Sequence, residues 1–115
     1  MSKISFEGIG EVAATFACED GAEAGKTVKV TGTGLVGPCA AGDRFCGVAL
    51  SVKDGYAAVQ VAGLVTLAVS GQGVSEGWMR LTADGSGGVK MAGDGDNGGE
   101  YLVAAVENGS AVALL

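Results

Sequence analysis

The chain has 115 residues, enough for one domain, and 48% of them are hydrophobic, which excludes disorder caused by a lack of apolar surface. Its 13 acidic and 7 basic residues give a net charge of −6. A surface of this sign repels phosphate backbones and anionic lipid, so we expect neither nucleic acid nor a membrane as a partner. Glycine occurs 22 times and aromatic residues make up only 5%, so small side chains must fill the core between glycine-punctuated segments.

The first ten residues combine an extended start around Ile4 and Phe6 with a break at Gly8 and Gly10. They lack the apolar stretch of a signal peptide, and no run in the chain approaches the roughly 20 apolar residues of a membrane helix. We therefore expect synthesis in a bacterial cytoplasm. The organisation we expect is a single β domain over residues 1–115, with residues 1–10 as an extended N-terminal arm.

The next segments predict strands joined by glycine-rich turns. Residues 11–18 contain no turn residue and predict a strand, which an acidic loop follows. Polar and apolar residues alternate over residues 26–31, which predicts a half-buried strand with Val28 and Val30 on its inner face. Asp54-Gly55 is typical of a type I′ hairpin turn and separates two β-rich segments. Residues 64–69 predict a further strand.

The second half of the chain repeats the plan of the first. Residues 28–31 align with residues 79–82, and Asp54-Gly55 aligns with Asn108-Gly109. Each unit, at about 26–60 and 77–115, predicts strand, turn, strand, hairpin and strand. Neither unit is large enough to close a core alone. The sequence therefore predicts an all-β fold, a small glycine-rich β-barrel or β-sandwich in which two units pack face to face and the last strand ends inside the sheet.

The chain is poorly equipped for catalysis. It has no histidine, which removes the commonest general base and the commonest metal ligand. Its three cysteines, Cys18, Cys39 and Cys46, are an odd number, which is poor evidence for a disulfide framework. We interpret them as small buried hydrophobic residues, with Cys39 and Cys46 as the one plausible pair. We expect no enzyme, and no catalytic, cofactor-binding or metal-binding residues.

Several local motifs have two interpretations each. Residues 94–100 are rich in carboxylates, as a calcium loop is, but they are too short for the full pattern and favour an exposed turn. Lys90 precedes Met91 as in biotin-carrier hairpins, but it follows a valine, so we expect a lysine on the outward face of a strand. No Lys-Ser/Thr follows the glycines of residues 85–88, which argues against a phosphate loop. Trp78 is either a core or cap residue at the start of a strand, or a ligand-stacking platform or interface anchor.

Two stretches carry a resemblance to a known family. Residues 41–50 are similar to a "Gly-Asp, then Gly-Val-Ala" element, and residues 59–67 to a "Val-x-Val-x-Gly-Val-Val-x-Leu" element. Over roughly residues 25–115 the chain resembles small phage and prophage proteins that were long described as a domain of unknown function and are linked to capsid decoration. The resemblance implies a virion structural protein, often a homotrimer, that binds the major capsid protein on the outer capsid surface and stabilises the shell.

The residues also suggest where a partner binds. An extended N-terminal segment can add a strand to the edge of a partner's sheet, although it can equally pair within its own barrel. The candidate partner-binding residues are Ser2, Lys3, Ile4, Ser5, Phe6 and Trp78. The alternative function is a surface- or carbohydrate-binding β module of a phage tail fibre or host-attachment device. An exposed aromatic platform at Trp78 or Tyr56 beside a polar pocket would favour this alternative.

Overall fold

A computed structural model describes residues 11–115, and the fold within that range is all-β, as predicted. The strands are β1 (Val12–Cys18), β2 (Thr27–Gly32), β3 (Leu35–Pro38), β4 (Gly47–Lys53), β5 (Tyr56–Ala62), β6 (Leu64–Ala68), β7 (Gly77–Ala83), β8 (Val89–Met91), β9 (Gly99–Glu107) and β10 (Ser110–Leu114). Over residues 11–115 there is no helix, and hence none that is long and apolar enough to cross a membrane.

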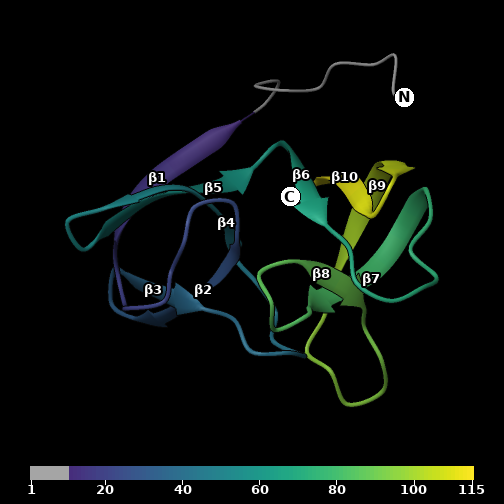
Figure 1. The fold of residues 1–115 in the computed structure, drawn as a ribbon, viewed down its shortest axis with the longest axis horizontal. Helices are drawn as coiled ribbons and strands as arrows, with labels where there is room; N and C mark the ends of the chain where they lie inside the picture. The colour runs from purple at the N-terminus through teal and green to yellow at the C-terminus, as the bar shows by residue number, and fades with distance from the viewer. Residues whose placement is uncertain (1–10) are drawn as a thin grey trace.

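The strands form two lobes that follow each other along the chain. Sheet A is a small closed barrel with the order β1-β3-β2-β4-β5, and sheet B has the order β6-β10-β9-β7-β8. Figure 1 shows the first lobe in purple to teal and the second in teal to yellow, on opposite sides of the molecule. β10 lies between β6 and β9, so the C-terminal strand is interior to its sheet, as the sequence predicted.

The two lobes share one topology, which confirms the internal repeat. Both β3-β2-β4-β5 and β8-β7-β9-β10 are runs of antiparallel neighbours. β1 lies antiparallel to β5 and parallel to β3. β6 lies antiparallel to β10, and Val69 just after it forms a parallel bridge to Val89 in β8. The repeated unit is therefore five strands long, two strands longer than the three that the sequence indicated.

The two predicted hairpin turns are present at equivalent places in the lobes. Asp54 and Gly55 have φ angles of 54° and 79°, and Asn108 and Gly109 have φ angles of 45° and 78°. Positive φ at both central residues defines the type I′ turn, which matches the twist of the strands that it joins. The first turn connects β4 to β5, and the second connects β9 to β10.

Each lobe has its own hydrophobic cluster, so the expectation that the two units would close one core between them is wrong. The buried residues of the first cluster are Ala22, Val28, Val36, Ala49, Ala57 and Val59. Those of the second are Phe45, Val48, Leu67, Leu81, Val89, Val103, Ala111 and Ala113. Alanine and valine dominate both clusters, and the second also takes in Phe45 and Val48 from just before and within β4 of the first lobe. Val30 departs from its predicted inner position and is 56% exposed, whereas Val28 on the same strand is fully buried.

The loop between β3 and β4 fastens the lobes together. The Gly42 N–H donates to the Ala83 carbonyl, and the Ala83 N–H donates to the Asp43 carbonyl, both over 2.9 Å. The Thr82 hydroxyl also donates to the Asp43 carbonyl over 2.9 Å. The Asp43 carboxylate is itself held by the Lys29 ammonium at 2.5 Å, which lowers the pKa of Asp43 below its ordinary value. The bonds to Thr82 and Ala83 join segments about 40 residues apart and tie the two lobes together.

Candidate binding surface

The outer face of sheet B carries a row of large apolar side chains that crosses four strands. Trp78 on β7 lies opposite Leu102 on β9, Leu102 lies opposite Leu114 on β10, and Leu114 lies opposite Leu64 on β6. Directly opposed residues of antiparallel strands place their side chains on the same face. We call these four residues the apolar row. Trp78 is 65% exposed and Leu114 is 40% exposed, whereas Leu64 and Leu102 between and beside them are half-buried.

Strand alternation explains why these side chains point outward. On β10, Ala111 and Ala113 are buried in the core, which turns Val112 and Leu114 to the opposite face. On β6, Leu67 is likewise buried. Both strands are therefore apolar on both faces, a composition typical of strands that are covered on both sides.

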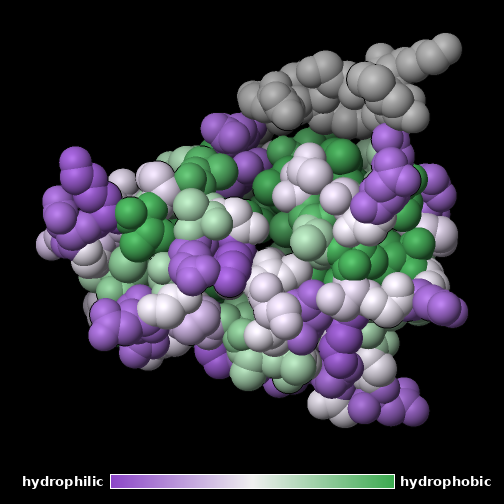
Figure 2. Space-filling model, in the orientation of Figure 1, coloured by the Kyte–Doolittle hydropathy of each residue, from purple (hydrophilic) through white to green (hydrophobic). Residues whose placement is uncertain are grey.

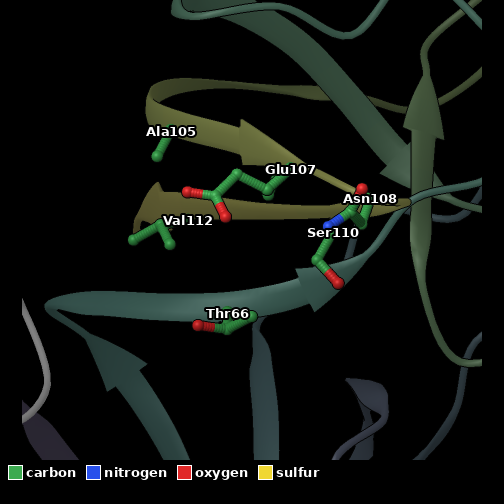
Figure 3. A pocket seen from close by; sticks show the side chains of 7 residues that line it. Thr66, Ala105, Glu107, Asn108, Ser110 and Val112 are labelled. Carbon is green, nitrogen blue, oxygen red and sulfur yellow. The ribbon is translucent and has the colours of Figure 1, made fainter. Parts of the chain in front are cut away.

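A shallow hollow of about 270 Å³ adjoins the apolar row. It is lined by Thr66, Ala105, Glu107, Asn108, Ser110, Ala111 and Val112. Figure 3 shows their side chains on adjacent strands, with the Val112 methyl groups and the Thr66 hydroxyl along its length. Val112 is two residues from Leu114 on the same strand, so the hollow and the apolar row form one surface.

Charged residues flank this surface. Arg80 on β7 lies opposite Glu100 on β9, two residues along these strands from Trp78 and Leu102, and Glu107 lines the hollow. Figure 2 shows hydrophobic residues gathered on the side where β6, β9 and β10 lie, with hydrophilic residues around them. An apolar centre with a polar rim is the ordinary composition of a protein–protein interface, and exposed apolar patches on single domains mark such sites.

The structure places some of the predicted partner-binding residues and not others. Trp78 is exposed at the start of β7, so a core position is wrong for it, while a cap, a stacking platform or an interface anchor stays a prediction. Ser2, Lys3, Ile4, Ser5 and Phe6 lie outside the described residues. Tyr56 is 59% exposed but belongs to β5 in the other lobe. Neither Trp78 nor Tyr56 lines the hollow.

The three cysteines are free thiols, each half-buried, so the candidate pair Cys39–Cys46 is not bonded. Burial raises the pKa of Cys39 to about 11, and burial also raises the pKa of Cys46 above its ordinary value. Both thiols therefore remain protonated at neutral pH, whereas a nucleophile or metal ligand requires the thiolate.

The acidic loop after β8 makes turn contacts. The Gly93 N–H donates to the Asp96 carboxylate over 2.8 Å, and the Lys90 ammonium lies 3.9 Å from the same oxygen. Across the part of the chain that the structure describes, no group of three or more histidine, cysteine or acidic side chains is placed to hold a metal ion. Lys90 is half-buried on β8 beside Asp96 rather than on an exposed hairpin tip.

Sequence reasoning missed Leu64, Leu102 and Leu114 as surface residues. A signal for two of them was present, because β6 reads Leu-Val-Thr-Leu-Ala and β10 reads Ser-Ala-Val-Ala-Leu. Neither strand alternates cleanly between polar and apolar residues, which indicates that both of its faces are covered. No protein-family model matches the sequence, and no curated protein is significantly similar to it.

Proposed function

We propose that this chain is a virion structural protein that binds the outer surface of a phage capsid and stabilises the shell. The observation that carries the proposal is the exposed apolar row of sheet B with its adjoining hollow. Burying these side chains against another protein removes apolar surface from water, which is the main driving force of association. In this proposal the surface contacts the major capsid protein, and the protein resides on the outside of the virion.

The rigidity of the molecule supports a holding role. The contact surface is built mainly on the strands of sheet B, and hydrogen bonds of Gly42 and Asp43 tie the two lobes together. A surface that is already ordered loses little conformational freedom on binding, so more of the contact energy appears as affinity. Such a platform suits a protein that clamps neighbouring shell subunits.

The resemblance to capsid-decoration proteins and the net charge of the chain also support this proposal. The elements at residues 41–50 and 59–67, which resemble those of capsid-decoration proteins, form the end of the β3–β4 loop with the start of β4, and the end of β5 with most of β6. A net charge of −6 keeps copies of the protein apart at high local concentration while the uncharged row remains available for contact. We propose a homotrimer only as the arrangement that the resemblance implies.

Co-sedimentation with matured, empty capsids of the source phage tests the proposal. The unaltered protein is expected to sediment with the shells and to raise the temperature at which they open. The double variant Trp78→Ser, Leu114→Ser should fold normally and lose most of this binding, because it removes the two most exposed side chains of the apolar row. Leu50→Ser is the matched control, since Leu50 is 42% exposed on β4 in the other lobe.

Two results would count against the proposal. The first is failure of the unaltered protein to bind shells at any maturation stage. The second is retention on immobilised glycans through Trp78 without capsid binding, which would instead indicate the carbohydrate-binding module of an attachment device.

A further inference from the structure

The N-terminal part of β1 has a free edge. β1 pairs with β5 from Val12 to Ala17, but on its other side it meets β3 only at Ala17 and Cys18. No strand among the described residues covers the stretch from Val12 to Phe16 on that side. Residues 12–15 are all exposed, and Val12 is 53% exposed. Figure 1 shows this part of β1 extending beyond β3 along the margin of the first lobe. We call residues 12–16 the free edge.

The backbone of the free edge is directed to accept another strand. The Cys18 N–H donates to the Gly55 carbonyl at the β5 hairpin, whereas the Ala17 N–H donates to Gly34 beside β3. Backbone groups of successive residues point to opposite sides of a strand. Ala13 and Thr15, which lie two and four residues before Ala17, therefore point their N–H and C=O groups away from β5. An unpaired row of this kind is a template for pairing with another chain.

We propose that the free edge pairs with the free edge of a second copy, antiparallel and about a twofold axis at Ala14. In this register, Ala13 exchanges two hydrogen bonds with the partner's Thr15, and Thr15 does the same with the partner's Ala13. Ala14 faces the partner's Ala14 at the axis. The contact is isologous and closed, so it produces a dimer and no filament.

The length of the free edge fits this register. It spans five residues, because β3 occupies the same side of β1 from Ala17 onward. With the axis at the middle residue, Val12 lies opposite the partner's Phe16, and the pairing ends where each copy's β3 begins. Val12 and Phe16 share a strand face, so the exposed Val12 side chain gains an apolar neighbour across the interface.

Charge favours self-pairing at this edge over other surfaces. The molecule carries a net charge of −6, so copies repel each other in general, yet residues 12–16 contain no charged side chain. In the proposed register the two Glu11 residues lie at opposite ends, about 20 Å apart at roughly 3.4 Å per residue, which exceeds the screening length of physiological salt. Exposed edges are ordinarily protected by lysine, proline or a bulge. Lysine and proline are absent from the free edge, and the one register shift of its pairing with β5 lies at its end, between Val12 and Ala13.

The dimer does not depend on the capsid proposal. It uses sheet A, whereas the apolar row belongs to sheet B, so both contacts can form at once. Its twofold symmetry differs from the threefold symmetry that the family resemblance implies. Failure of capsid binding and failure of dimerisation are therefore separate results.

Light scattering after gel filtration and sedimentation equilibrium test the pairing with the full chain. The expected particle has twice the 11.2 kDa mass of one chain. Thr15→Pro removes an outward N–H and leaves the bonds to β5 intact, so it should abolish the dimer and keep the fold. Ala14→Lys should also abolish the dimer by placing two charges face to face. Leu50→Lys adds the same charge at an exposed position on β4 and should remain dimeric.

A disulfide trap fixes the register. Opposed residues of a non-hydrogen-bonded antiparallel pair have Cα atoms about 4.5 Å apart, within the range of a disulfide. Ala14→Cys should therefore form a covalent dimer under mild oxidation far faster than Leu50→Cys or the unaltered chain. A monomeric unaltered protein at every accessible concentration overturns the proposal. So does a dimer that survives both Thr15→Pro and Ala14→Lys, or crosslinking of Ala14→Cys that is no faster than the controls.

Discussion

The ring of Phe45 stacks on the ring of Tyr101, with centroids 4.9 Å apart and planes inclined by 13°. Phe45 precedes β4 of the first lobe but is buried in the core cluster of the second, and Tyr101 belongs to β9 of that second lobe. The Tyr101 hydroxyl also donates to the Phe45 carbonyl over 3.4 Å. This pair therefore connects the two halves of the repeat through their side chains, beside the backbone bonds of Gly42 and Asp43.

Removing the stack should destabilise the whole molecule. We expect Phe45→Ala to lower the free energy of unfolding by about 3–5 kcal/mol, because it deletes a buried ring and leaves a cavity between the lobes. Tyr101→Phe keeps the stack and loses only the long hydrogen bond, so its cost should stay below about 1 kcal/mol. Urea unfolding followed by tryptophan fluorescence measures both. Equal losses in the two variants would show that the hydroxyl, not the ring, joins the lobes.

Two glycines of the β4–β5 region should respond differently to alanine. Gly55 has a φ of +79° and open space around its absent Cβ, so Gly55→Ala costs only backbone strain, about 1–2 kcal/mol. At Gly47 a Cβ would collide with the Gln60 carbonyl oxygen and approach Val59 within 2.7 Å. Gly47→Ala must push the paired strand away and should cost more. Thermal unfolding ranks the two variants, and a smaller loss at Gly47 would mean that β5 yields there.

The hairpins and the repeat were predictable because their causes are local. Asp54-Gly55 and Asn108-Gly109 supply positive φ at two consecutive positions, which selects the turn type without help from distant residues. The place of β1 in the barrel was not predictable. It depends on a parallel pairing to β3 and an antiparallel pairing to β5, and nothing within β1 encodes either partner. The same holds for the bridge from Val69 to Val89 that completes the second lobe.

The position of Trp78 could have been read from strand alternation. On β7, Trp78 and Arg80 share one face, while Met79 and Leu81 share the other. An arginine marks its face as solvent-exposed, so Trp78 belongs outside despite the average tendency of large aromatic residues to be buried. The contacts of the loop between β3 and β4 could not be predicted in this way, because Gly42 bonds to Ala83 only once both lobes have formed.

The carboxylate of Asp84 should make the protein sensitive to acid. It accepts hydrogen bonds from the Ser70 hydroxyl at 2.5 Å, the Ser86 N–H at 2.7 Å and the Gly88 N–H at 3.0 Å. Burial alone would raise the pKa of Asp84, but these bonds outweigh burial and hold the pKa below its ordinary value of 3.8. A carboxyl with a lowered folded-state pKa stabilises the fold above its unfolded pKa, and this contribution is lost as the pH falls through the folded pKa.

We therefore expect Asp84→Asn to cost about 1 kcal/mol at neutral pH, because an amide has one acceptor oxygen where the carboxylate has two. The difference from the unaltered protein should shrink as the pH falls below 3.8, where the aspartate itself becomes protonated. Urea unfolding over this pH range gives the measurement. Asp94→Asn, at an exposed loop position, is the control and should change little. A deficit at Asp84 that persists unchanged into acid would contradict the assignment.

The Cys39 thiol should be alkylated more slowly than its partial exposure alone would suggest. It is half-buried, and burial raises its pKa to about 11. Only the thiolate is alkylated, so at neutral pH Cys39 should react about two orders of magnitude more slowly than an exposed thiol of pKa about 8.5. Its rate should rise about tenfold per pH unit toward pH 11. Mass-spectrometric mapping after timed iodoacetamide pulses measures the rate, with the urea-unfolded chain as control. Fast alkylation of folded Cys39 at neutral pH would mean that the loop between β3 and β4 opens, which contradicts its role as the fixed junction between the lobes.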